Sequence, residues 1–168
     1  LKKELVSCLR MARAKRWPRS KGEDRRGQIT DLLSIHVRPP EIEDRQFPGH
    51  WEGDLIIGTG RSAIGTLIER SSRSTLLVHL PRLEGWGKIP VVKNGASLGG
   101  YGAVAMNAAL ASSITSLPIQ LRKTLTWDRG KELSGHAQFT LDTGTKVFFA
   151  DPHSPWQRPT NENTNGLL

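Results

Sequence analysis

Three short apolar segments follow one another closely in the chain, and their spacing limits the folds that it can adopt. They lie at about residues 51–58, 63–70 and 74–80, and only a few polar or glycine residues separate them. Connections this short join antiparallel neighbours, because a parallel pair of strands needs a crossover of roughly a dozen residues or more. The sequence therefore predicts a sheet that starts with two β-hairpins.

The second half of the chain has a different pattern. Apolar side chains at helical spacing, followed by a proline, predict a helix over about residues 103–117. We expect strands at about 124–128 and 146–150 and a last helix from about residue 160, where polar side chains can cap it. The stretch around 134–142 stays open. Hairpins followed by alternating elements predict an α/β fold, a mixed sheet with helices on its faces.

Size and composition fit one globular domain. The 168 residues are 36% hydrophobic and 24% charged, and the apolar runs are far shorter than the ~20 residues that cross a bilayer. The single cysteine, Cys8, excludes an internal disulfide and a multi-cysteine zinc site. We therefore expect a soluble protein without a membrane segment. The chain begins with neither Met nor a secretion signal, so we expect it to be part of a longer protein.

The net charge of +8 is concentrated near the N-terminus. Residues 1–30 hold 10 Lys and Arg against 3 acidic residues, which leaves 14 against 13 elsewhere. Such a segment suits DNA phosphates through counterion release, although a solvated linker has the same composition. We therefore divide the chain into a basic segment and linker over 1–42 and a folded core over 43–168. The candidate DNA contacts in the basic segment are Arg13, Lys15 and Arg16.

Three carboxylates stand where segments of such a fold meet. Asp54 lies in the first apolar segment, Asp128 follows the predicted fourth strand, and Glu162 lies at the start of the last helix. Carboxylate oxygens are ligands that Mg²⁺ prefers, and two ions about 3.5–4 Å apart can promote cleavage of a phosphodiester. Because the chain has 16 acidic residues, spacing alone favours unrelated caps and solvated turns.

The residues around these carboxylates resemble the IS30 family of insertion-sequence transposases. The matching blocks occur in the order of that family, and 33 residues separate Asp128 from Glu162, as its Asp-Asp-Glu pattern expects. The resemblance covers about residues 25–168. It implies a ribonuclease-H-like core, shared with retroviral integrases, in which a mixed five-stranded sheet is flanked by helices and is incomplete at the C-terminus. The blocks are WEGDLIIG (51–58), TWDRGKE (126–132), WQR (156–158) and NENTNGLL (161–168).

By this resemblance, Asp54, Asp128 and Glu162 are the catalytic triad and hold the metal cofactor, which is Mg²⁺ or Mn²⁺ as two ions. The implied enzyme cleaves transposon ends and joins the 3′-hydroxyl to target DNA. Its implied partners are DNA and further copies of itself, and its implied location is the bacterial cytoplasm, at the nucleoid.

Basic side chains beside the triad are further candidates for contact with DNA phosphates. They are Arg129, Lys131 and Arg158, which lie within a few residues of Asp128 or Glu162. Surface arginines and lysines are more often simply solvated, so the sequence alone leaves both interpretations open.

The chain departs from the family pattern in two places. Pro159 stands where the family usually has glycine, which a helix start accepts unless the backbone there needs a positive φ. The family also has a helix-turn-helix region upstream and more of the core downstream. Because only Asn161 to Leu168 remain of the last helix, below the ~12–15 residues at which an isolated helix becomes marginal, we expect Glu162 to be poorly held and this chain to be weakly active or inactive.

Three alternatives to a transposase stay open. A nuclease of the same fold would cut DNA without joining it. A non-catalytic DNA-binding module would bind without needing metal. A remnant of a decayed gene would show neither activity nor a cooperative melt.

Overall fold

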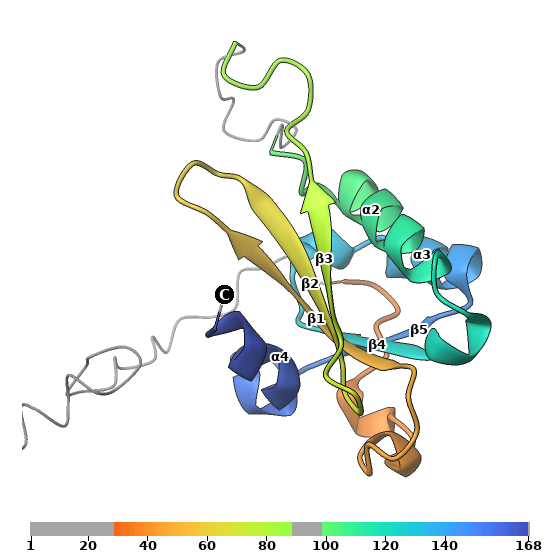
Figure 1. The fold of residues 1–168 in the computed structure, drawn as a ribbon. Helices are drawn as coiled ribbons and strands as arrows, with labels where there is room; N and C mark the ends of the chain where they lie inside the picture. Colours follow the sequence, from red (N-terminus) through yellow and green to blue (C-terminus); the bar gives the residue numbers. More distant parts are fainter. Residues whose placement is uncertain (1–28, 89–98, 168) are drawn as a thin grey trace, which may run out of the picture.

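The computed structural model describes residues 29–88 and 99–167, so Arg13, Lys15 and Arg16 lie outside the described residues. At its centre is a five-stranded sheet in the order β3-β2-β1-β4-β5 (Figure 1). β1, β2 and β3 pair antiparallel, whereas β4 and β5 continue the sheet from β1 in parallel. This confirms the predicted mixed sheet. The strands are β1 (His50–Ile57), β2 (Ala63–Glu69), β3 (Thr75–Leu80), β4 (Thr124–Trp127) and β5 (Lys146–Phe149).

Helices lie on both faces of the sheet. α2 (Ala103–Thr115) and α3 (His136–Thr143) cover one face, and α4 (Pro159–Asn165) lies against the other (Figure 1). α3 occupies the stretch that the sequence left open. In the described part of the chain, no helix is long and apolar enough to cross a membrane. Short 3-10 turns complete the fold: η1 (Ile35–Val37), η2 (Pro40–Ile42), η3 (Ile119–Leu121), η4 (Lys131–Leu133) and η5 (Pro155–Gln157).

The hydrophobic core lies between the sheet and the α2–α3 layer. Met106, Leu110 and Ile114 of α2 are fully buried in it, and Leu117, just beyond the helix, packs against it. These are the positions whose helical spacing predicts the helix. Full burial of such a side chain contributes about 1.5–3 kcal/mol. Packing on the core therefore holds α2 in place.

Gly53 of β1 lies directly under the ring of Trp127. We expect Gly53→Ala to destabilise the fold by about 1–3 kcal/mol, as overpacking usually does, because a Cβ there would lie 2.2 Å from Trp127 Cζ3 and 3.1 Å from Leu67 Cδ2. Urea unfolding followed by tryptophan fluorescence measures the loss. The control Gly102→Ala, where a Cβ has no neighbour within 4 Å, should lose less than about 1 kcal/mol. Equal losses would show that the Trp127 ring moves aside.

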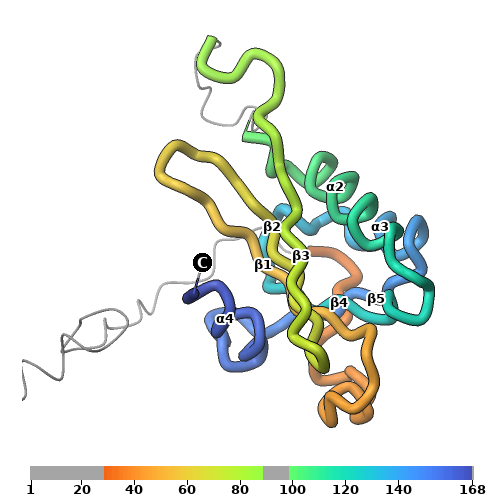
Figure 2. The backbone as a smooth tube through the Cα atoms, in the orientation of Figure 1, coloured from red at the N-terminus to blue at the C-terminus, as the bar shows by residue number. Residues whose placement is uncertain are grey.

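The apolar end of β1 is more exposed than its sequence suggests. The run from Leu55 to Ile57 is typical of a buried strand, yet Leu55 is only partly buried and Ile57 is exposed. The reason is that the β1–β2 hairpin, in yellow, projects beyond the helices that cover the rest of the sheet (Figure 2). Of the residues of β1, only those from His50 to Gly53 are buried, so an apolar run such as Leu55 to Ile57 does not by itself predict burial.

Residues 29–42, assigned to the linker from the sequence, pack on the sheet. Ile29, Ile35 and Ile42 are buried, and the backbone N–H of Phe149 in β5 donates to the carbonyl of Leu33 at 2.8 Å. Packed structure therefore extends upstream of residue 43, at least to Ile29.

Candidate functional site

The sheet register brings Asp54 and Asp128 together. β1 and β4 are parallel neighbours, with Glu52 opposite Thr126, and continuing this register by two residues places Asp128 level with Asp54. Glu52 contacts α4 through the Asn161 N–H, and side chains two residues apart on a strand share a face. Asp54, and Asp128 level with it, therefore lie on the α4 face. Asp54 Oδ1 accepts from the Leu55 N–H at 2.9 Å, and Asp128 Oδ1 accepts from the Gly130 N–H at 2.9 Å.

α4 supplies the third carboxylate, Glu162, in its first turn. The helix starts at Pro159, one residue before the predicted start, and proline suits this position because the first helical N–H needs no intrahelical acceptor. Pro159 is not among the described residues with positive φ, so it replaces the family's glycine without backbone strain. The predicted capping by local polar side chains is absent from α4. Glu52 of β1 instead accepts from the Asn161 N–H at 2.9 Å.

Arg158 lies between two of the carboxylates. Its side chain is only 7% exposed, and its guanidinium is 3.6 Å from Asp54 Oδ1 and 3.5 Å from Glu162 Oε1. It also donates to the carbonyl of Gly53 at 2.6 Å. Arg158 is a predicted contact for DNA phosphates, and in the structure its guanidinium is largely buried and faces Asp54 and Glu162.

The carboxylates affect one another electrostatically. Burial is the main cause that raises the pKa of Asp54; Arg158 opposes the rise, and the charge of Asp128 adds to it. Burial also raises the pKa of Glu162, which Arg158 opposes and to which Asp54 and Asp128 add. The three side chains therefore form one cluster of negative charge in which Arg158 is a counter-charge.

Glu132 adds a fourth carboxylate to this cluster. Burial raises its pKa, the Trp127 indole N–H that donates to it at 3.2 Å opposes the rise, and the charges of Asp128 and Asp54 add to it. No pattern in the sequence singles out Glu132, because the turn after β4 sets its place in η4.

Glu132→Gln should make the metal-free fold more stable near pH 7.5. A raised folded-state pKa means that the folded protein binds this proton more tightly than the unfolded chain, so ionisation costs stability as the pH rises. This loss in the free energy of unfolding reaches its full size above the raised pKa of Glu132, and it is absent below the ordinary glutamate pKa of about 4.3. Glutamine keeps an oxygen for the Trp127 donor. Urea unfolding at pH 7.5 and pH 4 should show the gain only at the higher pH, and a less stable variant at pH 7.5 would contradict this.

The donor set suits a hard divalent cation. The cluster offers carboxylate oxygens, the ligands that Mg²⁺ and Mn²⁺ prefer, and a bound cation would relieve the repulsion by which Asp54 and Asp128 add to the raised pKa of Glu162. As the side chains stand in the described part of the chain, no three His, Cys, Asp or Glu residues form a group that could hold a metal ion. Since Arg158 already pairs with Asp54 and Glu162, metal binding requires these groups to move relative to one another.

A small hollow of about 150 Å³ lies beside the cluster, where β4 and β5 end. Asp128, Arg129, His153 and Arg158 are among its lining residues. The Arg129 guanidinium is held there by the carbonyl of Ala150 at 3.2 Å and by Asp151 at 3.4 Å. Lys131, in η4, is exposed to solvent. Arg129 and Lys131 thus flank the cluster and stay candidates for contact with DNA.

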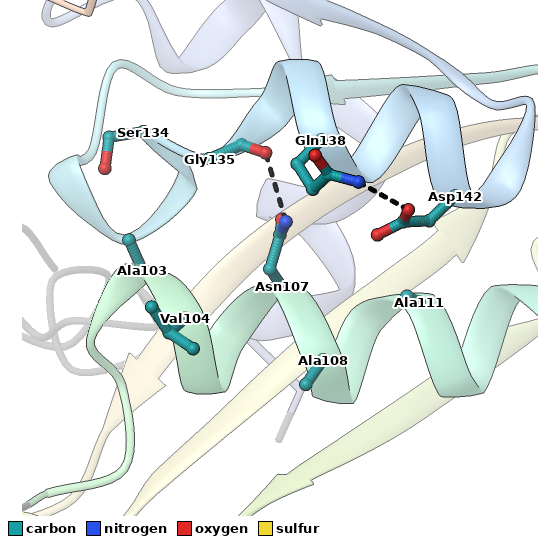
Figure 3. Close-up of a pocket in the computed structure, with 9 residues that line it drawn as sticks. All are labelled: Ala103, Val104, Asn107, Ala108, Ala111, Ser134, Gly135, Gln138 and Asp142. Atoms are coloured by element: carbon teal, nitrogen blue, oxygen red, sulfur yellow. Dashed lines mark hydrogen bonds between the residues drawn. The ribbon is translucent and has the colours of Figure 1, made fainter.

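A larger groove of about 440 Å³ lies away from the cluster, between α2 and α3 (Figure 3). Small side chains form much of its lining. Asn107 donates to the carbonyl of Gly135 at 3.1 Å, and Gln138 donates to Asp142 at 2.6 Å. Among the described residues that line the groove, Asp142 is the only one with a charged side chain, so they do not bring several catalytic side chains together.

Known proteins resemble the chain in sequence and in fold. It is 52% identical to the transposase for insertion sequence element IS1086 of Cupriavidus metallidurans, across 100% of this chain and 44% of that protein. It is 47% identical to transposase InsI for insertion sequence element IS30A of Escherichia coli K12, across 88% of this chain and 34% of that protein. The chain thus spans less than half the length of these relatives. No family model matches it.

A structural comparison supports the fold. A chain in the cryo-EM structure of the simian T-cell lymphotropic virus intasome in complex with PP2A regulatory subunit B56 gamma matches with a TM-score of 0.52 and 15% identity, over 73% of this chain and 39% of that one. With the observed strand order, this confirms the predicted ribonuclease-H-like fold. By its sequence similarity, the chain belongs to the family of insertion-sequence transposases that includes those of IS1086 and IS30.

Proposed function

We propose that this chain carries the catalytic core of a DNA transposase, which cleaves transposon ends and joins the freed 3′-hydroxyl to target DNA. The observation that carries this proposal is the meeting of Asp54, Asp128 and Glu162 from β1, the end of β4 and α4 in a chain 52% identical to a transposase. These residues come from segments far apart in the sequence, and their charges act on one another.

In the proposed reaction, Asp54, Asp128 and Glu162 hold Mg²⁺ or Mn²⁺, as two ions. When bound, such ions activate an attacking oxygen and stabilise the leaving oxygen of a phosphodiester. The protein contributes by position: the strand register fixes Asp54 against Asp128, and the docking of α4 fixes Glu162. No covalent intermediate with the enzyme is needed, since placement and charge stabilisation supply the catalysis.

Basic groups around the cluster would hold the DNA. Lys131 is exposed beside Asp128, and Arg129 lines the adjoining hollow, where a phosphate would approach the site. Arg158 pairs with the carboxylates, so we propose that it balances their charge rather than gripping DNA from the surface. Assembly as a homo-oligomer and a location in the bacterial cytoplasm at the nucleoid stay predictions from the family.

The experiment is an incubation of the chain with supercoiled plasmid that carries the inverted repeats of the matching element, with Mg²⁺, with Mn²⁺, or with EDTA. Gel mobility reports nicking, and sequencing of joined products reports strand transfer. The proposal expects cleavage at the repeats that needs the metal and is followed by joining.

Other outcomes separate the alternatives. Metal-dependent nicking without any joined product would favour a nuclease of the same fold. DNA binding that is unchanged by EDTA, with no cleavage at any protein concentration, would favour a non-catalytic module. If the 168-residue chain is inactive, the same assay on a protein extended to the length of the relatives decides whether the missing activity belongs to the added segments.

A further inference from the structure

α4 offers the sheet few apolar groups. Its seven residues, Pro159 to Asn165, read PTNENTN and include no Leu, Ile, Val, Met or aromatic side chain. A helix this short does not persist alone, because isolated helices become marginal only at ~12–15 residues. The position of Glu162 therefore depends on the polar contacts that α4 makes with β1 and β2.

Glu52 makes the contact at the start of this helix. Its Oε2 accepts from the backbone N–H of Asn161 at 2.9 Å, and its backbone carbonyl accepts from the Asn161 side-chain amide at 3.3 Å. Its Oε1 forms an ion pair with Arg70 Nε at 3.1 Å, and the Glu52 side chain is 0% exposed. Glu52 thus joins β1 to the residue that directly precedes Glu162.

A second set of contacts continues one helical turn further on. The Asn165 amide donates to Asp54 Oδ2 at 3.1 Å and to Asn161 Oδ1 at 2.8 Å, and its own Oδ1 accepts from the Thr66 hydroxyl at 3.0 Å. Asn161 also donates to that hydroxyl at 3.2 Å. The two asparagines form a ladder from Glu52 to Asp54, which are two residues apart on one face of β1.

We propose that Glu52, together with Asn161, is a positioning clamp for Glu162 in the cluster. This inference rests on the proposed function, in which Glu162 holds metal. The N–H of Asn161 lies in the first turn of α4, where no intrahelical carbonyl is available to accept it. A buried carboxylate is the acceptor, and charge-assisted bonds of this kind are stronger than neutral ones. The clamp therefore fixes both the tilt of α4 and the distance of Glu162 from Asp54.

Glu52→Gln tests the clamp without changing the size of the side chain. Glu52 places one oxygen on the Asn161 N–H and the other beside the Arg70 guanidinium, whereas glutamine offers one oxygen and one NH₂, so either the Asn161 N–H or Arg70 faces another donor. We expect hydrogen exchange across residues 159–167 to quicken at least tenfold, and affinity for Mn²⁺ in calorimetry to weaken at least tenfold.

Glu69→Gln is the matched control. Glu69, the last residue of β2, is also buried, and it accepts from the N–H groups of Gly49 at 3.1 Å, Ser71 at 2.9 Å and Ser72 at 2.6 Å, none of which belongs to α4. This variant should lower the melting temperature, yet leave exchange in 159–167 and Mn²⁺ affinity within twofold of the parent, both measured well below its melt. If Glu69→Gln changes α4 as much as Glu52→Gln does, the effect is general loss of stability and the proposal is overturned.

A second variant keeps the test open if Glu52→Gln gives no cooperative melt. Asn161→Ala leaves the Glu52–Arg70 pair intact and removes the amide bonds to Glu52 and Thr66, so it should change both readouts in the same direction by less. Unchanged exchange and unchanged affinity in Asn161→Ala, or in a folded Glu52→Gln, would overturn the clamp. Failure of the proposed function looks different: the parent chain would bind no Mn²⁺ at the cluster, while exchange in α4 would still decide whether Glu52 positions that helix.

Discussion

Asp54→Asn should lower metal-dependent cleavage of transposon-end DNA roughly 10³-fold or more, because a bound metal contributes several kcal/mol of charge stabilisation and every ~1.4 kcal/mol is a factor of ten in rate. Asparagine has nearly the same shape and keeps an oxygen for the Leu55 N–H, but its NH₂ then faces the Asn165 amide that donates to Asp54 Oδ2. The sheet should stay folded, with a weaker contact between β1 and α4. The substitution removes the negative charge of Asp54, which adds to the raised pKa of Glu162. Single-turnover cleavage of a labelled end measures the loss.

The control for this variant is Asp44→Asn. Asp44 is an exposed acidic residue in the segment before β1, and its substitution changes the net charge by the same amount. We expect it to cleave at the parental rate. DNA binding by filter retention should be equal in both variants. An Asp54→Asn protein that retains more than about a tenth of the parental rate would contradict a metal-binding role for this carboxylate.

Arg158→Gln should destabilise the metal-free chain and respond more strongly to Mn²⁺ than the parent. Removing one partner of a fully buried ion pair costs about 3–5 kcal/mol. Here the carboxylates of Asp54 and Glu162 are 24% and 41% exposed, and solvent reduces the cost to roughly 2 kcal/mol. For a chain of this size, that lowers the melting temperature by roughly 4–8 °C.

Melts with Mn²⁺ distinguish the loss of the Arg158 positive charge from a loss of packing as the cause of the lower melting temperature. A divalent ion replaces the positive charge that Arg158 supplied, so saturating Mn²⁺ should raise the melting temperature of Arg158→Gln more than that of the parent and narrow the gap between them. Thermal melts with and without metal measure the melting temperatures of the parent and of Arg158→Gln. A gap that is the same with and without Mn²⁺ would show that Arg158 acts through its contact with the Gly53 carbonyl alone.

The sheet and α2 could be predicted from the sequence because local patterns determine them. Short polar connections predict the hairpins from β1 to β3, and the spacing of Met106, Leu110 and Ile114 predicts both α2 and its buried face. The exposed end of β1 could not be predicted, since exposure of Ile57 depends on how far the helices reach across the sheet. Packing of residues 29–42 on the sheet was missed for the same reason: their partners are distant in sequence.

The sequence could indicate that the acidic residues of the candidate site lie near one another, but it could not indicate the contacts that hold them in place. Asp54, Asp128 and Glu162 were found through the resemblance of the blocks around them, and the structure brings them together. The expectation that Glu162 is poorly held came from treating α4 as an isolated helix. In the structure, α4 is fixed by Glu52 and by Asn165, contacts that join β1 to α4 across more than 100 residues. Weak or absent activity of this chain stays a prediction.

A crystal structure with Mn²⁺, with anomalous diffraction measured at the manganese edge, tests most directly whether the three carboxylates bind metal. We expect anomalous peaks contacted by carboxylate oxygens of Asp54, Asp128 and Glu162, with the Arg158 guanidinium displaced from at least one of its two carboxylate partners. Parallel crystals of Asp54→Asn should lose the peaks. An ordered cluster without anomalous density at saturating Mn²⁺, or density bound only elsewhere on the protein, would contradict the claim that these three carboxylates form a metal-dependent catalytic site.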